Sequence, residues 1–360
     1  MKHLIRITLL ALIAIAPAQA AVLCSWNIER LGHGNQKAYE ALGHIGNHCD
    51  FIAVQELMTE DGQQRFLRAL HTHDRNWASM ASHALGRGSY TEMYAFYYRQ
   101  GTVDYDDGAI VYLDRRDTYA REPYSARFRT AKGTRFAVGT IHVIYGQSVR
   151  DRLPEITALA DYFTWLAEVY PNTPRMLMGD FNLAPHHDAW QPLKVHAKPL
   201  ITEGASTLSA IDGRYANLYD NIWLAHNSTL AISNSGIIKF PEMLRTQSGA
   251  PVTHEWARRH VSDHAPVYIT TDGARLNPRQ MTVSAQGQQT QPPETQKPAT
   301  PAAAQQGRGW QGPVRGNRNS RVYHASHCPS YNAMNEANRV EFSSEAEAMA
   351  AGYRAAGNCR

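Results

Sequence analysis

The stretch Arg175-Met-Leu-Met-Gly-Asp-Phe-Asn-Leu183 is the one around which the rest of the chain is organised. A short apolar run that stops at a glycine is typical of a buried strand. Pro174 marks its start, because proline cannot continue a preceding helix. Asp180 and Asn182 follow Gly179 two residues apart, so both side chains point to the same side while the chain stays extended. Ligands of open α/β sheets bind beyond the carboxyl ends of the strands, so we predict that this carboxylate and this amide face a binding site.

Strand-like and helix-like patterns alternate on both sides of this stretch. Apolar residues recur at helical spacing in residues 39–45, and a longer amphipathic stripe runs through residues 153–166. The alternation predicts one large α/β domain over residues 21–271, with no internal repeat. The other expected strands are residues 22–26, 51–55, 77–84, 94–98, 109–113, 135–141, 218–225 and 265–270.

Polar residues stand at or beside the ends of most of these strands. Taken singly, each has an ordinary explanation: Glu56 could be a surface strand end, His142 a satisfied core histidine, and Asp180 with Asn182 an Asx turn. A whole set of such residues in one domain favours a shared site instead. The set comprises Asn27, Glu56, His142, Asp180, Asn182, Asp220, Asp263 and His264.

The donor atoms of this set indicate a hard metal ion together with acid–base chemistry. Glu56, Asp263 and the Asn27 carbonyl offer the oxygen ligands that Mg²⁺ or Ca²⁺ takes, whereas soft ligands for zinc are missing from the set. An imidazole titrates near neutral pH and can be oriented by a carboxylate. His142 and His264 are therefore candidates for a general acid and a general base.

Residues 1–20 have the pattern of a secretory signal peptide. Lys2 and Arg6 precede or flank an apolar run that is too short to span a bilayer, and Ala18-Gln-Ala20 forms a small-residue cleavage site. No other long apolar run follows, so we expect a secreted or periplasmic protein with no membrane span. Loss of Lys2 and Arg6 with the leader lowers the formal net charge from +4 to +2. The overall charge therefore does not indicate a nucleic-acid partner.

The composition changes after residue 271. Residues 272–312 are rich in Gln, Pro, Thr and Ala, and no aromatic residue lies between Tyr268 and Trp310. This segment is expected to be a disordered linker. Aromatic and apolar residues return in residues 313–360, which predict a very small α+β module. The whole chain has only four cysteines, so a hydrophobic core rather than a disulfide scaffold must hold the large domain together.

The ordered motifs resemble those of the endonuclease/exonuclease/phosphatase superfamily, and the middle of the chain is similar to its deoxyribonuclease I branch. The resemblance covers nearly all of residues 22–271 and implies a two-sheet, four-layer α/β sandwich of the deoxyribonuclease I type. The superfamily-like motifs are Ser25-Trp-Asn-Ile28, Val54-Gln-Glu56, Gly139-Thr-Ile-His142, Met178-Gly-Asp-Phe-Asn182, Leu218-Tyr-Asp-Asn-Ile222 and Val261-Ser-Asp-His264. The branch-like stretches run from Gly86 to Arg99, from Tyr105 to Gly108 and from Arg121 to Pro123.

The resemblance also implies which residues hold the metal and the phosphate. Asn27, Glu56 and Asp263 would form the metal site. Asp180 and Asn182 would contact the scissile phosphate or the attacking water. Hydrolysis of a phosphodiester needs a positioned water and neutralisation of the charge that builds on the nonbridging oxygens, which these groups can provide.

The same resemblance assigns the proton transfers to two histidines. His264, oriented by Asp220, would be the general base. His142, paired with Glu92, would be the general acid that protonates the leaving 3′ oxygen. Each imidazole would thus depend on one carboxylate.

Two further residues match family positions that contact DNA in and beside the minor groove, namely Tyr90 and Arg121. An arginine in a narrow minor groove reads shape more than base identity, so low sequence specificity is expected. Where the mammalian enzymes carry arginines after the motifs of the first and second strands, this chain has Glu29 and Met58. Weaker or differently placed duplex binding is expected in consequence.

The cysteine pairs of the family are missing from this chain. Calcium-linked stabilisation near the family's disulfide loop is therefore in question, although Asp104, Asp106 and Asp107 could supply oxygen ligands or simply form a solvated turn. Cys24 lies inside the first expected strand, where a buried free cysteine is common, so Cys24 and Cys49 need not be bonded.

The tail resembles a small module appended to bacterial nucleases and similar to the metal-binding domain of the Ada repair protein. His324, Cys328 and Cys359 fall on three of its four ligand positions, but Ala356 occupies the fourth. An exported module of this size needs a covalent staple or a metal, and a zinc site would lack one protein ligand. We therefore expect a disulfide between Cys328 and Cys359.

Three functions fit the sequence. The first is a secreted or periplasmic endodeoxyribonuclease that uses Mg²⁺ or Mn²⁺ and acts on DNA as a monomer. The second is a phosphodiesterase or phosphatase of the same superfamily that acts on lipid or sugar phosphates, against which residues 86–99 and Arg121 argue. The third is a catalytically dead binding protein of the same fold. None of the acids or histidines is replaced, so we expect the first.

Overall fold

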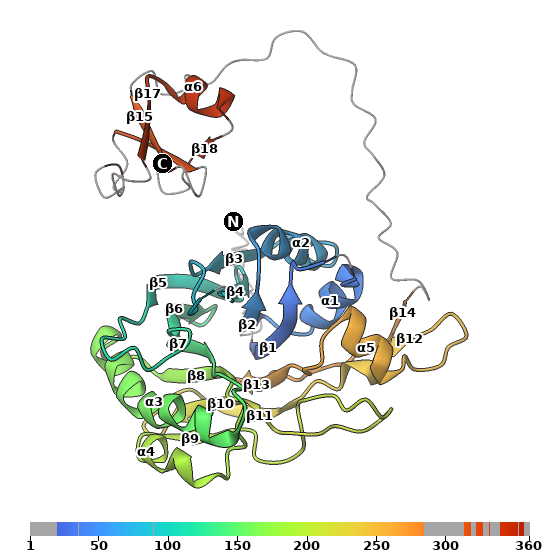
Figure 1. The fold of residues 1–360 in the computed structure, drawn as a ribbon. Coiled ribbons are helices and arrows are strands. Elements are labelled where there is room, and N and C mark those ends of the chain that lie inside the picture. Colours follow the sequence, from blue (N-terminus) through green and yellow to red (C-terminus); the bar gives the residue numbers. More distant parts are fainter. Residues whose placement is uncertain are drawn as a thin grey trace, which may run out of the picture. The chain divides into compact units, whose positions relative to one another are not determined.

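The computed structural model describes residues 20–34, 36–88, 90–283, 313–317, 322–326, 331, 339–351 and 353–355. The chain divides into two compact units, Met1–Gln289 and Thr290–Arg360 (Figure 1). Among the described residues, no helix combines the length and the apolar character that a membrane crossing requires.

The first unit contains two six-stranded sheets. The strand order of the first sheet is β11-β13-β1-β2-β4-β3. β1 and β2 are parallel neighbours, and the remaining neighbours are antiparallel. The strands are β1 (Val22–Leu31), β2 (Phe51–Leu57), β3 (Trp77–Ala81), β4 (Met93–Arg99), β11 (Ile232–Ile237) and β13 (Val267–Thr271), and the helices α1 (Tyr39–Gly46) and α2 (Glu60–His71) follow β1 and β2.

The second sheet has the strand order β5-β6-β7-β8-β10-β9. β7 and β8 are parallel, with α3 as the helix between them, and the other neighbours are antiparallel. The elements are β5 (Val103–Val111), β6 (Tyr124–Thr130), β7 (Arg135–His142), α3 (Val149–Val169), β8 (Arg175–Asp180), α4 (Gln191–Lys194), β9 (Ala197–Pro199) and β10 (Asp220–Ala225).

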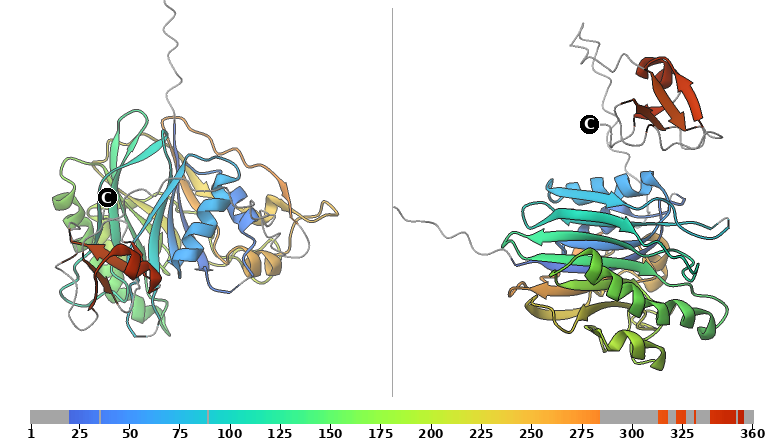
Figure 2. Two further views of the ribbon diagram at one scale, coloured as in Figure 1. Left: turned by 90° about the horizontal axis from the view of Figure 1, so that it is seen from above. Right: turned by 90° about the vertical axis from the view of Figure 1, so that its left-hand side faces the viewer.

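Three hydrophobic clusters hold the layers together. The middle cluster lies between the sheets and includes Phe51 of the first sheet and Phe128 of the second, with ring centroids 4.8 Å apart. The outer clusters pack α1 and α2 against the first sheet and α3 and α4 against the second (Figure 2). Along β1, Leu23 belongs to the middle cluster and Cys24 to an outer one, as the alternation of side chains in a strand requires. The unit is a four-layer α/β sandwich, which confirms the predicted fold.

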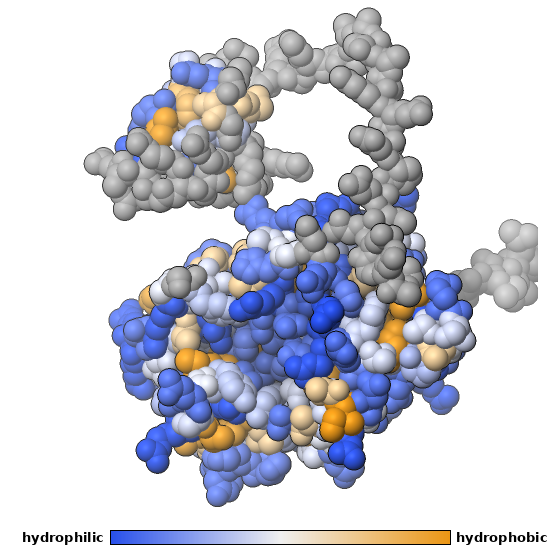
Figure 3. Space-filling view, turned by 45° about the vertical axis from the view of Figure 1, so that its right-hand side comes forward, coloured by the Kyte–Doolittle hydropathy of each residue, from blue (hydrophilic) through white to orange (hydrophobic). Residues whose placement is uncertain are grey.

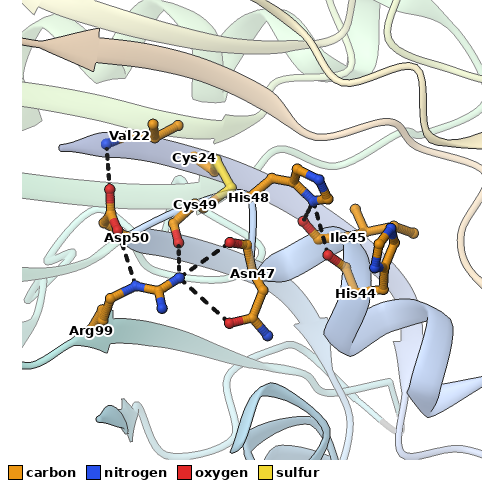
Figure 4. Close-up of a disulfide and its surroundings, with 9 residues drawn as sticks. All are labelled: Val22, Cys24, His44, Ile45, Asn47, His48, Cys49, Asp50 and Arg99. Carbon is orange, nitrogen blue, oxygen red and sulfur yellow. Dashed lines mark hydrogen bonds and ion pairs between the residues drawn. A yellow bond between two sulfur atoms is a disulfide. The ribbon is translucent and has the colours of Figure 1, made fainter. Parts of the chain in front are cut away.

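A disulfide joins Cys24 of β1 to Cys49, which lies two residues before the start of β2 (Figure 4). The sequence left the state of Cys24 and Cys49 open, and the structure shows them bonded to each other. The physical reason is the parallel pairing of β1 and β2, which brings the start of β2 beside β1 and leaves the two Cα atoms 6.1 Å apart. Asp50 strengthens the same junction, because it accepts a hydrogen bond from Val22 N and another from Arg99 Nε.

The packed chain of the first unit continues past residue 271, where the sequence places the start of the linker. β14 (Met281–Thr282) pairs with β12 (Leu244–Arg245), and Val283 is buried. Leu276 and Met281 pack against the outer cluster of the first sheet. These apolar residues give the segment enough surface to bury, which the Gln- and Pro-rich chain after them does not have.

The second unit is small. Its four-stranded sheet consists of β15 (Val314–Asn317), β16 (Val322–Ala325), β17 (Arg339–Phe342) and β18 (Arg354–Ala355), with the helix α6 (Glu345–Ala350). Val314, Tyr323, Phe342 and Tyr353 form part of its core. His324 lies on β16, whereas Cys328 and Cys359 are outside the described residues.

Candidate active site

The site forms at the strand ends of the second sheet, where β7 and β8 end and β10 begins. His142 lies opposite Asp180 in the parallel pair β7 and β8, and Asp180 lies opposite Asp220 in the antiparallel pair β8 and β10. A Cβ atom on Gly179 would lie 2.0 Å from the carbonyl oxygen of Ile141, so glycine permits the close approach of β7 and β8. The strand register thus places one imidazole and two carboxylates in a row.

Asp180 is the centre of the site. Its side chain is buried, and its Oδ2 lies 3.6 Å from Nε2 of both His142 and His264. The same Oδ2 accepts a hydrogen bond from Nδ2 of Asn27 at 3.1 Å. Burial would raise the pKa of Asp180, but the imidazoles of His264 and His142 hold it below its usual range. One carboxylate oxygen therefore links β1 with both histidines.

His142 and Glu92 form the first histidine–carboxylate pair of the site, which we call the His142 arm. Its Nδ1 lies 3.0 Å from Oε1 of Glu92, a residue that is almost completely buried. Burial lowers the pKa of His142, but the Glu92 carboxylate outweighs this effect, and the pKa is raised to about 9. Burial would also raise the pKa of Glu92, yet His142 and Arg121 hold it below its usual range. The imidazole is therefore protonated at neutral pH.

His264 and Asp220 form the second histidine–carboxylate pair, which we call the His264 arm. Its Nδ1 lies 2.8 Å from Oδ2 of Asp220, whose other oxygen is buried without a hydrogen-bond partner. Burial lowers the pKa of His264, but the carboxylates of Asp220 and Asp180 together hold it well above its ordinary value. Ser262 fixes the backbone here, because its Oγ accepts from His264 N and donates to the carbonyl of Asn27.

Two of the predicted metal residues, Asn27 of β1 and Glu56 of β2, lie on the first sheet near Asp180, and Asp263 lies before β13 with Oδ1 4.0 Å from Nε2 of His264. Oε1 of Glu56 accepts from Nδ2 of Asn27 at 3.0 Å, and Oε2 accepts from the backbone N–H of Arg30. The Oδ1 of Asn27, which the sequence analysis proposes as a ligand, accepts from Glu29 N at 3.0 Å. Asn27 thus bridges Glu56 and Asp180 through its amide nitrogen, and its Oδ1 retains a second lone pair for a cation.

The electrostatics of this side fit a divalent cation. Burial raises the pKa of Glu29, and the negative charges of Asp263 and Glu56 raise it further, against the opposing charge of Lys37. Lys37 lies 3.5 Å from Glu29 and donates to the carbonyl of Val261 at 2.8 Å. Hard oxygen donors in a region where carboxylates crowd one another suit Mg²⁺ or Mn²⁺. The residues present therefore match the metal that the resemblance implies.

Asn182 shows that the Asx turn and a site role are not alternatives. Its backbone N–H donates to Oδ1 of Asp180 at 2.9 Å, which is the Asx turn, and its φ of 50° lies in the left-handed region that asparagine tolerates. Its Nδ2 donates to the carbonyl of Val143 at 2.8 Å. The turn itself holds the amide beside the Asp180 carboxylate.

Tyr90 and Arg121 lie on the Glu92 side of the site. Tyr90 is 38% exposed, and its hydroxyl donates to Oε2 of Glu92 at 3.2 Å. Arg121 is buried: Nη2 donates to the carbonyl of His142 at 2.9 Å, and Nε lies 3.5 Å from Oε1 of Glu92. Tyr90 is therefore open to a ligand, whereas Arg121 supports the His142 arm, a role that the sequence analysis missed.

The acidic residues that the sequence suggests as calcium ligands lie on β5, and two of them have arginine partners. Oδ2 of Asp106 lies 2.6 Å from Nε of Arg127 and 3.1 Å from Nε of Arg135. Asp107 also lies near Arg127, and Asp104 accepts from a backbone N–H. Within the described parts of the chain, these acids do not form a group of three close metal-ligating atoms. This part of β5 therefore carries ion pairs rather than a preformed calcium site.

Comparison with known proteins identifies the family. The model of the Endonuclease/Exonuclease/phosphatase family matches residues 24–194. A deoxyribonuclease of Thioalkalivibrio sp. is 45% identical over 287 residues, which cover 77% of this chain and 79% of that protein. The chain belongs to the endonuclease/exonuclease/phosphatase family.

Other relatives place the chain in the deoxyribonuclease I-like branch of this family. Deoxyribonuclease gamma of Rattus norvegicus is 27% identical over 300 residues, covering 74% of this chain and 89% of that protein. A mannosyl-6-phosphatase of Bacteroides thetaiotaomicron has a similar structure, with a TM-score of 0.54, 16% identity and coverage of 70% of this chain and 99% of that one. This last likeness shows the shared fold alone.

The family match ends at residue 194, before three of the predicted site residues. Asp220, Asp263 and His264 lie beyond it, yet the structure brings them to Asp180. The site therefore joins residues from both sheets and from most of the length of the first unit.

Proposed function

We propose that the protein is an exported endonuclease that hydrolyses phosphodiester bonds of DNA with the help of a divalent cation. The carrying observation is the pair of imidazoles around Asp180, each with Nε2 3.6 Å from the same oxygen and Nδ1 bound to a buried carboxylate. Hydrolysis of a phosphodiester needs a proton acceptor for water and a proton donor for the leaving oxygen. Two oriented imidazoles supply both.

His142 acts as the general acid in this proposal. Its pKa of about 9 keeps Nε2 protonated at neutral pH, and Glu92 holds the opposite nitrogen. The ring therefore has a proton to give to the leaving oxygen and is fixed in the orientation that delivers it.

His264 acts as the general base. Asp220 accepts the hydrogen on Nδ1, so a neutral ring carries its free lone pair on Nε2. Because the pKa of His264 is raised, this neutral form becomes abundant only at a higher pH than in a free imidazole. Protonation of His264 thus sets the acidic limit of activity.

Glu56, Asp263 and Asn27 would hold the metal ion, and Asp180 and Asn182 would contact the scissile phosphate or the attacking water. When bound, the ion would neutralise charge on the nonbridging phosphate oxygens and position the water. Mg²⁺ or Mn²⁺ is the proposed cofactor, and Ca²⁺ can take the same hard ligands.

DNA is the proposed substrate for two reasons. The relatives at 45% and 27% identity are named deoxyribonucleases. Tyr90 presents an exposed aromatic ring beside the His142 arm, with the guanidinium of Arg121 5.8 Å from its centroid. Arg121 is buried, so the exposed contact is the Tyr90 ring, and aromatic contacts with bases tolerate any sequence. We therefore infer low sequence specificity.

Export is supported by two independent features. Residues 1–20 have the signal-peptide pattern, and the disulfide between Cys24 and Cys49 is typical of an oxidising compartment. We propose a secreted or periplasmic protein that acts as a monomer. Fractionation of the native host, followed by sizing of the purified protein, tests both statements.

Cleavage of supercoiled plasmid by the purified mature protein tests the function directly. With Mg²⁺ or Mn²⁺ we expect nicked and then linear DNA, and with chelator we expect intact plasmid. The His142→Ala and His264→Ala variants are the matched controls against a contaminating nuclease. Full cleavage in chelator would contradict metal dependence, and phosphate release from sugar phosphates without any DNA cleavage would favour the phosphatase alternative.

A further inference from the structure

Tyr145 is an exposed aromatic residue on the loop after β7, three residues beyond His142. Its side chain is 59% exposed, yet it is not loosely held. The guanidinium carbon of Arg152 lies 4.2 Å from the centroid of the ring, and Nε of Arg152 donates to the carbonyl of Tyr145 at 2.8 Å. A cation–π contact and a backbone hydrogen bond from one side chain therefore orient this tyrosine.

Arg152 is itself a buried residue of α3 that connects Tyr145 with the site. It is 4% exposed, and its Nη1 donates to the carbonyl of Asn182 and lies 3.4 Å from the hydroxyl of Tyr219. Asn182 in turn donates from Nδ2 to the carbonyl of Val143, two residues before Tyr145. Tyr145 and Asn182 thus belong to one hydrogen-bonded unit, and the tyrosine lies at the rim of the site.

The exposed ring has the properties of a stacking surface. An aromatic side chain that is already oriented loses little conformational freedom when a ligand packs on it. Every nucleobase has a flat face that can stack on such a ring, whatever its identity. Tyr90 is a second exposed aromatic residue beside the site, but it is less exposed, and its hydroxyl is bound to Glu92. The more exposed Leu113 and Val195 are aliphatic and offer no stacking surface.

We propose that Tyr145 stacks on an accessible nucleobase next to the scissile phosphate, and that it strengthens binding to single strands and unpaired segments of DNA. This inference rests on the proposed nuclease function. In an intact duplex a base is already stacked between its neighbours, and contact with Tyr145 would require it to leave that stack. The ring thus adds binding to unpaired DNA that an ordinary duplex cannot use.

Cleavage kinetics on matched oligonucleotides test this proposal. The substrates are a single strand, its blunt duplex, the same duplex with an internal unpaired loop, and a single strand with abasic nucleotides around the cleavage position. For Tyr145→Ala we expect KM on the single strand and on the loop to rise about tenfold, with little change on the duplex and the abasic strand. Tyr145→Trp should restore the wild-type values, because it retains an aromatic face.

Tyr105→Ala is the matched control. Tyr105 is 39% exposed and lies on β5 opposite Phe128, which pairs with Phe136 near the start of β7, far along the strand from His142. Tyr105→Ala should leave the KM for all four substrates unchanged. Thermal melting of each variant checks that the fold is intact, since a destabilised Tyr145→Ala protein would lose activity on every substrate.

Binding measured without catalysis separates this inference from the proposed function. In chelator, fluorescence anisotropy with the labelled single strand should show about tenfold weaker binding by Tyr145→Ala than by the wild type. Unchanged binding and unchanged KM on single strands would overturn the stacking role. An equal loss on all four substrates, in a variant that melts like the wild type, would also overturn it. A wild type that binds single strands through Tyr145 but cleaves none would overturn the nuclease proposal alone.

Discussion

The two imidazole arms of the site share a design but differ in their surroundings. Glu92, which orients His142, is also met by Tyr90 and Arg121, and its pKa lies below the usual range. Asp220, which orients His264, keeps one buried oxygen without a partner, and burial raises its pKa. This contrast teaches that an imidazole gains proton affinity from a buried carboxylate in either setting, because the pKa of both rings is raised although the pKa of Glu92 is lowered and that of Asp220 is raised.

Removal of either imidazole should have the largest effect on catalysis. His142→Ala and His264→Ala should each lower kcat at least about a hundredfold, because a positioned acid or base contributes that much or more. The kcat of the double variant should be only slightly lower than that of the less active single variant, since both rings act in one step. Single-turnover cleavage of plasmid measures this, with exposed His226→Ala as control. Near wild-type rates in both single variants would refute the assigned roles.

The proton on His142 should also be visible in stability. Its pKa is about 9 in the folded protein and near 6.5 when unfolded, so the charged ring stabilises fully below about pH 6.5, and this stabilisation is lost as the pH rises through about 9. Between pH 7 and 10 the wild type should lose about 2 kcal/mol of unfolding free energy that His142→Gln does not lose. Urea unfolding in chelator measures the difference, and parallel pH profiles would contradict it.

Loss of the Glu92 charge should distinguish the two arms by their effect on the pH dependence of the rate. Glu92→Gln keeps a hydrogen-bonding side chain but removes the charge that raises the pKa of His142. We expect kcat to fall about tenfold at neutral pH and the alkaline limb of the rate profile to move to lower pH. Asp220→Asn should leave that alkaline limb in place, because it acts on the other imidazole. An alkaline limb that does not move in Glu92→Gln would mean that His142 is not the group that titrates there.

Arg121 gives the smallest expected effect and the opposite shift. Its cation lowers the pKa of His142, so Arg121→Ala should move the alkaline limb slightly to higher pH. It should also weaken DNA binding a few-fold and reduce the salt dependence of cleavage, if the guanidinium contributes to the potential at the phosphate. Arg121→Lys should retain the salt dependence. An unchanged salt slope in Arg121→Ala would confine this residue to the support of His142.

Most of the secondary structure could be predicted from the sequence, because the strands carry apolar runs that stop at polar residues. The stripe over residues 153–166 became α3, and every expected strand is present, although β5 begins six residues before the expected strand at 109–113 and β1 ends five residues after residue 26. α2, β6, β11 and several short elements were missed. β11 has a largely exposed face, and β6 carries Arg127 and Arg129 among its apolar residues, so neither shows a clear apolar pattern.

The site residues were also named from the sequence, but their relations were not. The Cys24 and Cys49 disulfide depends on a strand pairing between residues 25 positions apart. The burial of Arg121 beside Glu92 depends on packing across the two sheets. Arg152 gave no signal at all, since an arginine on a helix is usually on its surface and here it is held by Tyr145 and Asn182.

The sequence by itself determined the order of the strands along the chain, the polar residue at the end of each, and the family to which they point, because these follow from local pattern and motif. Only the tertiary structure decided that Asp180 stands between two histidines, that the pKa values of both rings are raised, and that Tyr145 is fixed at the rim. The physical reason is that proton affinity, burial and side-chain orientation depend on the register and packing of segments far apart in the sequence, which no local pattern records.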